Sequence, residues 1–160
     1  MKLIGALILV FAALLLIRLY KKYVDVGVRQ AHAFFDLLVG LKRQISVSGT
    51  PVDRFISGYK SELLSELGFF SEYEKRGSLS GAFFALGKRL FIPREIGQAI
   101  GRIFDGIGRG TLSGEVKGMD DGAVELKKMI TEYQSEAERS VRCVSVVTVA
   151  AALGLLIILV

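Results

Sequence analysis

Two uncharged apolar runs lie at opposite ends of this 160-residue chain, at residues 3–17 and 144–160. The fifteen residues of the first run rise only about 22 Å as a helix. Extension by about one turn, with Arg18 reaching outward, brings it close to the roughly 30 Å of a bilayer core. A chain of this length has no core large enough to surround a helix that is apolar on every face. The pattern therefore predicts transmembrane helices over residues 1–20 and 143–160.

The first run also has the shape of a cleaved secretory signal, with Lys2 ahead of a short apolar stretch. No A-x-A cleavage site follows it, and the run ends instead at Arg18, Lys21 and Lys22, with two tyrosines beside them. Basic residues and tyrosines at this point are typical of a helix that leaves a membrane. We therefore expect an uncleaved anchor.

Basic residues border both apolar runs on the side of the central segment. They are Arg18, Lys21, Lys22, Arg139 and Arg142. The outer side of the first run carries only Lys2. The positive-inside rule therefore predicts a cytoplasmic domain over residues 21–142 and places both termini on the opposite side of the membrane. We expect the five basic side chains to lie at the membrane interface, where each attracts anionic head groups by about 1 kcal/mol.

Apolar and small residues recur in steps of three and four at both ends of the central segment. The first stripe runs from Tyr20 to Ile45, and the second runs from Val116 to Val144, where it enters the second apolar run. Such spacing predicts two long helices that pack as an antiparallel pair and continue into the two membrane helices. The alternative is that each stripe faces the core of a shared helical bundle.

Three shorter helical patterns lie between the stripes and start at Thr50-Pro51, Ser78 and Pro93. Thr50 is the predicted N-cap of the first pattern, whose apolar face extends to Leu67. The charged stretch that closes at Gly77 is predicted as a loop. No segment alternates between apolar and polar residues for long enough to form a strand. The predicted fold class is all-α, a small bundle of five or six helices including the N-terminal and C-terminal transmembrane helices.

Glycines recur every four residues from Gly106 to Gly122. In polar sequence, each glycine inside a helix costs up to about 1 kcal/mol relative to alanine. We interpret Gly106 to Gly114 as a turn between helices. Gly118 and Gly122 are interpreted as points where the following helix approaches a neighbour closely.

The composition restricts the chemistry that the chain can perform. It has one Cys and one His, and its net charge is +5. One Cys and one His supply too few ligands for a His/Cys zinc site, and one Cys forms no internal disulfide. The sequence has no Walker A motif and assembles no nucleophile, base and oxyanion hole. We therefore expect no enzyme activity, no metal and no cofactor.

The sequence around the third short pattern is basic. Lys88 and four arginines outweigh Glu95 and Asp105 by three charges. The arginines form a candidate partner-binding set, Arg89, Arg94, Arg102 and Arg109. An ordinary solvated surface is the alternative interpretation. Because no aromatic residues alternate with the basic ones, we do not expect nucleic-acid binding.

Several segments occur in an order that is typical of a known family. They are Arg29 before a leucine-spaced helix ending at Gln44-Ile45, Thr50-Pro51-Val52, Phe104-Asp105-Gly106-Ile107-Gly108, Glu136-Ala137-Glu138 and Leu153-Gly154-Leu155. Over nearly its whole length the chain resembles the stage III sporulation protein AB family of endospore-forming bacteria. The resemblance implies a cytoplasmic helical domain similar to the inner-membrane platform protein of type II secretion and type IV pilus machines.

The resemblance also implies a location and partners. The location is the mother-cell membrane around the forespore, within the channel complex that links the two cells. The partners are a secretion-type ATPase, stage III sporulation protein AA, and the other membrane proteins of the complex. The sequence leaves open whether the chain also forms a homo-oligomer. We therefore expect a non-enzymatic membrane scaffold that presents its helical domain to the ATPase. The alternative is a lipid-responsive sensor or signalling hairpin, whose helices repack when the membrane changes.

Overall fold

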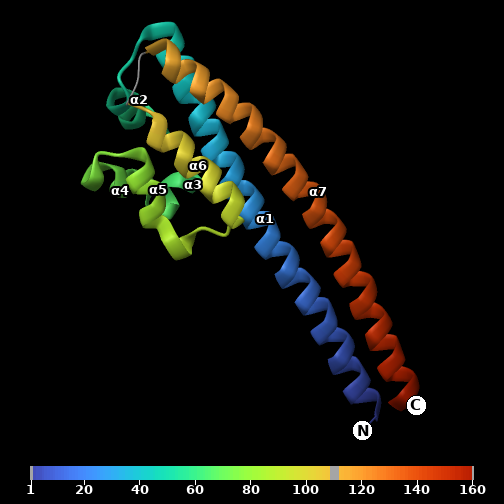
Figure 1. The fold of residues 1–160 in the computed structure, drawn as a ribbon. Helices are drawn as coiled ribbons and strands as arrows, with labels where there is room; N and C mark the ends of the chain where they lie inside the picture. The colour runs from blue at the N-terminus through green and yellow to red at the C-terminus, as the bar shows by residue number, and fades with distance from the viewer. Residues whose placement is uncertain (1, 109–111, 160) are drawn as a thin grey trace. The chain divides into compact units, whose positions relative to one another are not determined.

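The computed structural model describes residues 2–108 and 112–159, and every regular element in these ranges is helical (Figure 1). In chain order the elements are α1 (Lys2–Ser48), α2 (Val52–Gly58), α3 (Glu62–Leu67), α4 (Phe69–Arg76), α5 (Leu79–Leu86), the 3-10 helix η1 (Gly87–Arg89), α6 (Arg94–Gly106) and α7 (Leu112–Leu159). The all-α prediction is confirmed. The seven α-helices in these ranges exceed the five or six expected, because the region after α1 divides into shorter helices than its pattern indicated.

The chain consists of two compact units. The hairpin unit comprises Met1–Val26 and Glu132–Val160, and the bundle unit comprises Gly27–Thr131. Helices α1 and α7 each contribute to both units.

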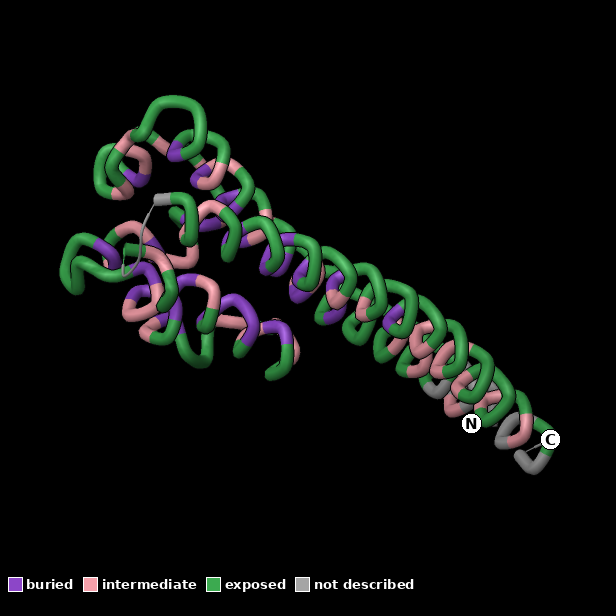
Figure 2. The backbone as a smooth tube through the Cα atoms, turned by 45° about the horizontal axis from the view of Figure 1, so that its top comes forward, coloured by how far each residue is buried: buried purple, intermediate pink, exposed green. Residues whose placement is uncertain are grey.

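In the hairpin unit, the first part of α1 and the last part of α7 lie side by side and antiparallel, with the N and C termini at the same end (Figure 1). The antiparallel pairing predicted for the two long helices is confirmed in this unit. Val24 and Ala137 are buried, whereas most of the other described side chains of the unit are partly or fully exposed (Figure 2). Within the described residues, no helix combines the length and the apolar content needed to cross a membrane.

Four phenylalanines from four helices form the centre of the bundle unit. Phe34 of α1 packs edge-on against Phe69 of α4 and Phe83 of α5, with ring centroids 5.4 and 4.9 Å apart. The ring centroid of Phe104 of α6 lies 6.3 Å from that of Phe34. All four side chains are buried. In this unit, therefore, the α1 stripe faces a core shared with three other helices, as the bundle alternative predicted.

Both stripes are buried within the bundle unit. The buried positions are Ala31, Leu38, Leu41 and Ile45 on α1 and Met119, Ala123, Leu126 and Ile130 on α7. An ion pair between Lys42 and Asp120 also joins the two long helices in this unit. The stripes therefore identified the core-facing surface of both helices, although not the helices that complete the core.

The charged stretch predicted as a loop is helix α4, so that prediction is wrong. Glu72 lies 3.4 Å from Lys75 Nζ and 3.2 Å from Arg76 Nε, at the (i, i+3) and (i, i+4) spacings that stabilise a helix. These ion pairs hold the pKa of the Glu72 carboxyl below its ordinary value, with the Arg76 hydrogen bond as the largest cause. Phe69 and Tyr73 bury the opposite face of the helix.

Two glycines border α4, one before its first residue and one after its last. Gly68 ends α3 with φ +83°, and Gly77 ends α4 with φ +63°. Only glycine adopts these left-handed conformations without a steric penalty. The glycines thus act as helix stops with another helix directly beyond each one.

The first short pattern also differs from its prediction. Pro51, not Thr50, occupies the N-cap of α2, and the helix ends at Gly58. The Ser61 hydroxyl accepts a hydrogen bond from the Leu64 N–H at 3.4 Å and begins a new helix, α3. Because a serine N-cap favours a helix start over continuation, the apolar face to Leu67 spans two helices.

The predictions for the glycines near the α6–α7 connection hold only in part. Gly106 is the last residue of α6 and Gly114 lies within α7, so both ends of the predicted turn Gly106–Gly114 are helical, and Gly110 lies outside the described residues. A Cβ at Gly122 would lie 2.8 Å from Ile103 Cγ1, which confirms a close approach between α6 and α7. The same prediction is wrong for Gly118, where a Cβ would meet nothing within 4 Å.

Candidate functional site

Five exposed basic side chains of the hairpin unit occupy a narrow band along its axis, which we call the basic collar. They are Arg18, Lys21 and Lys22 on α1 and Arg139 and Arg142 on α7. Helix α1 begins at Lys2 and α7 ends at Leu159, and both ends lie at the same end of the unit (Figure 1). The α1 members lie 16–20 residues from Lys2, and the α7 members lie 17–20 residues from Leu159. At 1.5 Å per residue, the whole collar lies about 24–30 Å from that end.

Large apolar side chains are exposed between the collar and the terminal end of the hairpin unit. They include Ile8, Phe11, Leu14 and Leu16 on α1 and Val146, Val147, Leu153 and Ile157 on α7. No Asp or Glu occurs in the sequence at 1–24 or 139–160. Soluble monomers rarely leave large contiguous apolar patches exposed, and many large apolar side chains are exposed in this unit. The arrangement therefore suits contact with an apolar medium or an apolar partner.

Tyrosines from both helices lie beside the collar. Burial raises the pKa of the Tyr133 hydroxyl on α7, and the nearby Tyr23 and Tyr20 of α1 raise it further. An aromatic ring with a polar tip is favoured where an apolar environment meets water. The hairpin unit thus has an apolar end, a basic collar and tyrosines on both helices.

The predicted partner-binding arginines do not form one cluster in the described part of the bundle unit. The Arg89 guanidinium donates a hydrogen bond to the Leu67 carbonyl at 3.1 Å, so this side chain holds η1 against the end of α3. Arg94 is exposed at the first turn of α6, and Arg102 follows two turns later, about 12 Å along the helix axis. Arg109 lies outside the described residues.

Arg102 has a partner within the chain, because its Nη2 atom lies 3.8 Å from Glu125 Oε1 on α7. The two side chains are 73% and 60% exposed, and an ion pair this exposed contributes little to stability. Arg102 therefore stays accessible to a charged group of another molecule.

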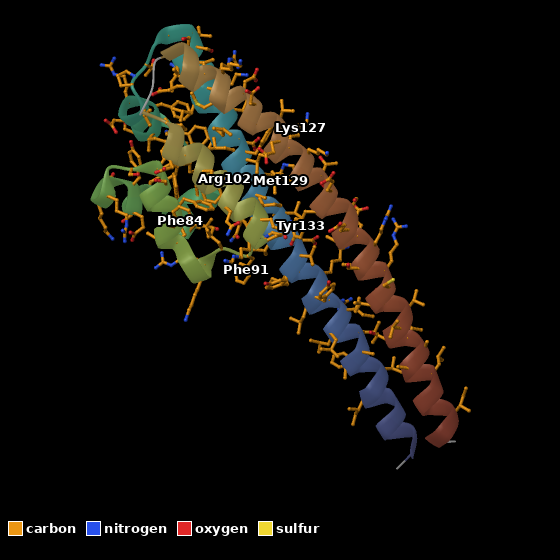
Figure 3. The ribbon with its side chains drawn as sticks, viewed as in Figure 1. Phe84, Phe91, Arg102, Lys127, Met129 and Tyr133 are labelled. Carbon is orange, nitrogen blue, oxygen red and sulfur yellow. The ribbon has the colours of Figure 1, made fainter. Side chains whose placement is uncertain are left out.

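An exposed aromatic residue beside Arg102 was not predicted from the sequence. Phe84 of α5 is 60% exposed and lies close to Arg102 of α6 (Figure 3). The two residues help to line an open hollow of about 540 Å³, together with Gln98, Gly101 and Asp105. The tandem pair Phe83-Phe84 was the available signal, because only one of two adjacent aromatic residues in a helix can face the core.

A second hollow, of about 530 Å³, lies between α6 and the start of α7. Its lining includes Ile103 and Met119 with Gly106, Gly114, Gly118 and Gly122. Four of the five glycines that recur in the sequence therefore line one groove, and the fifth, Gly110, lies outside the described residues. The Ile103 side chain fills the space beside Gly122, whereas the space beside Gly118 and Gly106 is open.

Two buried polar side chains of the bundle unit, Gln30 and Tyr73, have hydrogen-bond partners within the chain. Gln30 is 3% exposed; its Nε2 donates to the Arg89 carbonyl at 3.1 Å, and its Oε1 accepts from the Phe91 N–H at 2.7 Å. The Tyr73 hydroxyl donates to an Asp53 carboxylate oxygen at 2.5 Å. Across 2–108 and 112–159, no group of three or more His, Cys, Asp or Glu side chains is arranged to hold a metal ion.

We compared the chain with family models, with curated proteins and with solved structures, and none of them matches it.

Proposed function

We propose that the chain is a non-enzymatic membrane scaffold, in which the hairpin unit inserts into a lipid bilayer and holds the bundle unit outside it. The basic collar is the observation that carries this proposal. The collar lies about 24–30 Å from the apolar end of the unit, a length comparable to the roughly 30 Å of a bilayer core.

The proposed membrane segments are residues 1–20 and 143–160, with residues 21–142 in the cytoplasm and both termini on the opposite side. Two features support this topology. The collar residues lie on the side of the central segment, as the positive-inside rule requires. Their long side chains can also keep the charge in the head-group region while the stems contact lipid. At this level each basic residue adds about 1 kcal/mol of attraction to anionic lipid.

The proposed partner of the bundle unit is a secretion-type ATPase of the stage III sporulation protein AA kind. This assignment follows from the resemblance to the stage III sporulation protein AB family, as does a place in the channel complex between mother cell and forespore. Arg94 and Arg102 are exposed and therefore suited to contact an acidic surface of the ATPase. Arg89 is a weaker candidate, because its guanidinium is bonded to Leu67.

The single cysteine of the chain gives a direct test of membrane insertion. Cys143 is exposed and lies 16 residues from Leu159, at the level of the collar. An environment-sensitive fluorophore on Cys143 is compared with the same label at Leu153→Cys and at the exposed position Ser57→Cys, both in a Cys143→Ser background. The vesicles contain phosphatidylcholine and phosphatidylglycerol with bromine atoms on the acyl chains.

We expect strong bromine quenching and a blue shift at position 153, a smaller effect at 143, and a spectrum unchanged from buffer at 57. A label at 153 that stays in water would contradict insertion. Equal, shallow depths at 143 and 153 would contradict a segment that crosses the bilayer.

A second experiment tests the partner. The full chain in lipid nanodiscs is mixed with the purified ATPase, and Arg94→Glu with Arg102→Glu is compared with Lys117→Glu, an exposed lysine on α7. We expect the double substitution to lose the complex and Lys117→Glu to keep it. A complex that survives the double substitution would contradict the arginine assignment. Absence of any complex, with vesicle binding that increases with anionic lipid, would instead favour the lipid-responsive sensor.

A further inference from the structure

We infer that the groove between α6 and the start of α7 is a docking site, and that it binds a basic amphipathic helix of a partner protein. The groove is the hollow of about 530 Å³ whose lining includes Ile103, Met119 and four glycines. The inference goes beyond the proposed scaffold function, because it assigns a further contact surface to the bundle unit and does not depend on membrane insertion.

The glycines of α7 leave room for another helix to approach closely. Gly114, Gly118 and Gly122 lie four residues apart and line the groove from the α7 side. Residues at this spacing share one face of a helix. The Ile103 side chain fills the space beside Gly122, whereas a Cβ at Gly118 or at Gly106 would meet nothing within 4 Å. The open part of the groove therefore lies beside Gly118 and Gly106.

Gly118 costs stability without a return inside the described part of the chain. It lies within α7, where a glycine lowers helix stability by up to about 1 kcal/mol relative to alanine. Its φ is not in the left-handed region, so the backbone does not require a glycine. No described side chain uses the space that the missing Cβ leaves. A glycine in this position is explained by the close approach of another molecule.

The two elements that form the groove favour a helical occupant. Both are α-helices, whose interior N–H and C=O groups are paired within the helix, so the groove has no sheet edge for an extended segment. An incoming helix pairs its own backbone groups and leaves none unsatisfied. The lining of α7 extends over eleven residues, from Gly114 to Glu125, which is about 16 Å or three turns. An amphipathic helix of three to four turns fits this length.

The charged side chains that line the groove indicate the sign of the partner. The acidic ones are Glu115, Asp121 and Glu125, all on α7. Arg102 is the only basic residue among the described lining residues, so the lining carries a charge of −2. Arg102 already lies opposite Glu125, with its Nη2 atom 3.8 Å from Glu125 Oε1 (Figure 3). Lys or Arg beside the apolar stripe of an incoming helix would complement this lining.

The same charge disfavours a second copy of this chain as the occupant. A symmetric dimer places the same surface of both copies in contact. Two grooves that met in this way would bring two linings of −2 together, and like charges repel at contact distance. The arrangement therefore favours a partner protein whose helix has small or aliphatic residues on one face and basic residues beside them.

The test uses the full chain in a nonionic detergent and a displayed library of randomised helical peptides as the probe. Empty micelles serve for counter-selection, because basic amphipathic peptides also bind apolar assemblies. We expect the enriched peptides to carry Lys or Arg beside Ala, Leu or Ile residues spaced three or four apart. Their affinity should decrease as the salt concentration rises, because salt screens exposed charges.

Two substitutions test the open space and the charge of the groove separately. Gly118→Leu fills the open part of the groove and favours the helix, so affinity should fall at least about tenfold while the chain stays folded. Asp121→Lys should lower the affinity for basic peptides by about tenfold and reduce its salt dependence. Gly58→Leu and Glu66→Lys are the matched controls, because both positions are exposed and lie outside this lining. We expect both controls to keep the affinity.

Several results would overturn the inference. They are no enrichment over empty micelles, enrichment of acidic or uncharged peptides, an affinity that Gly118→Leu or Asp121→Lys leaves unchanged, and self-association of the wild-type chain that Gly118→Leu abolishes. Urea unfolding separates a lost groove from a lost fold, and Gly118→Ala repeats the test with a smaller side chain. The detergent form requires no bilayer, and the ATPase contact is tested at Arg94 and Arg102, so failure of the proposed function is distinguishable from failure of this inference.

Discussion

Two glycines one turn apart on α7 have different surroundings. A Cβ at Gly122 would lie 2.8 Å from Cγ1 and 2.9 Å from Cδ1 of Ile103, whereas a Cβ at Gly118 would meet nothing within 4 Å. We expect Gly122→Ala to lower the free energy of unfolding by about 1–3 kcal/mol, because Ile103 must move. Gly118→Ala should raise it by up to about 1 kcal/mol through helix propensity alone. Urea unfolding followed by circular dichroism measures both, and a shift in the same direction would contradict the close approach.

Single residues also show where sequence patterns stop being informative. Gln30 is buried because its amide pairs with the backbone of Arg89 and Phe91, 59 and 61 residues along the chain. No local spacing predicts such a contact. The sequence places Arg89 in the candidate partner-binding set because of its charge. Its hydrogen bond to the Leu67 carbonyl depends instead on how α3 and η1 pack. Residue type was therefore predictable, whereas the role of the residue was not.

At the scale of elements, a hydrogen bond between α4 and α2 makes stability depend on pH. The Tyr73 hydroxyl donates to Asp53, and burial, followed by this hydrogen bond, raises the pKa of Tyr73 above its ordinary value. The folded chain therefore holds this proton more tightly than the unfolded chain, whose tyrosine pKa is about 10. The resulting stability is complete below about pH 10 and is lost as the pH rises above it.

We expect Tyr73→Phe to reduce the loss of stability between pH 8 and pH 11. It should not abolish that loss, because burial also raises the pKa of Tyr59 and Tyr133. Urea midpoints at both pH values measure the effect, with Ser57→Ala as a control on the exposed surface of α2. A variant with the same pH dependence as the wild type would contradict a raised pKa of the Tyr73 hydroxyl in the folded chain.

The long helices were predictable and the short ones were not, for a physical reason. In α1 and α7 the apolar stripe repeats over many turns, so its period is visible in the sequence and matches the buried positions. Helix α4 has eight residues and buries only Phe69 and Tyr73. Two apolar residues define no period, and tertiary contacts with Phe34 and Asp53 help to stabilise the helix. Short helices of this kind depend on the fold more than on their own sequence.

For the whole molecule, the two candidate surfaces differ in how much of each could be predicted. The collar residues are adjacent to the apolar runs in sequence, so their composition alone identified them. Their common level along the hairpin unit became evident only from the pairing of the helices. The surface around Phe84 and Gly101 joins α5 to α6 through a contact between residues 17 positions apart, and neither residue belongs to a recognisable motif. A surface that forms only when residues of different helices pack together can be identified from the structure but not from the sequence.

The bundle unit contains its own core, which leads to a prediction about the chain as a whole. Phe34, Phe69, Phe83 and Phe104 all belong to Gly27–Thr131 and contact one another within it. We expect residues 27–131, expressed alone, to unfold cooperatively in urea, with fraying only at the cut ends of α1 and α7. Phe34→Ala should lower the free energy of unfolding of this fragment by about 3–5 kcal/mol. Val47→Ala, at an exposed position of α1, should change it by less than about 0.5 kcal/mol. A fragment that melts without cooperativity would show that the bundle unit needs the hairpin unit to fold.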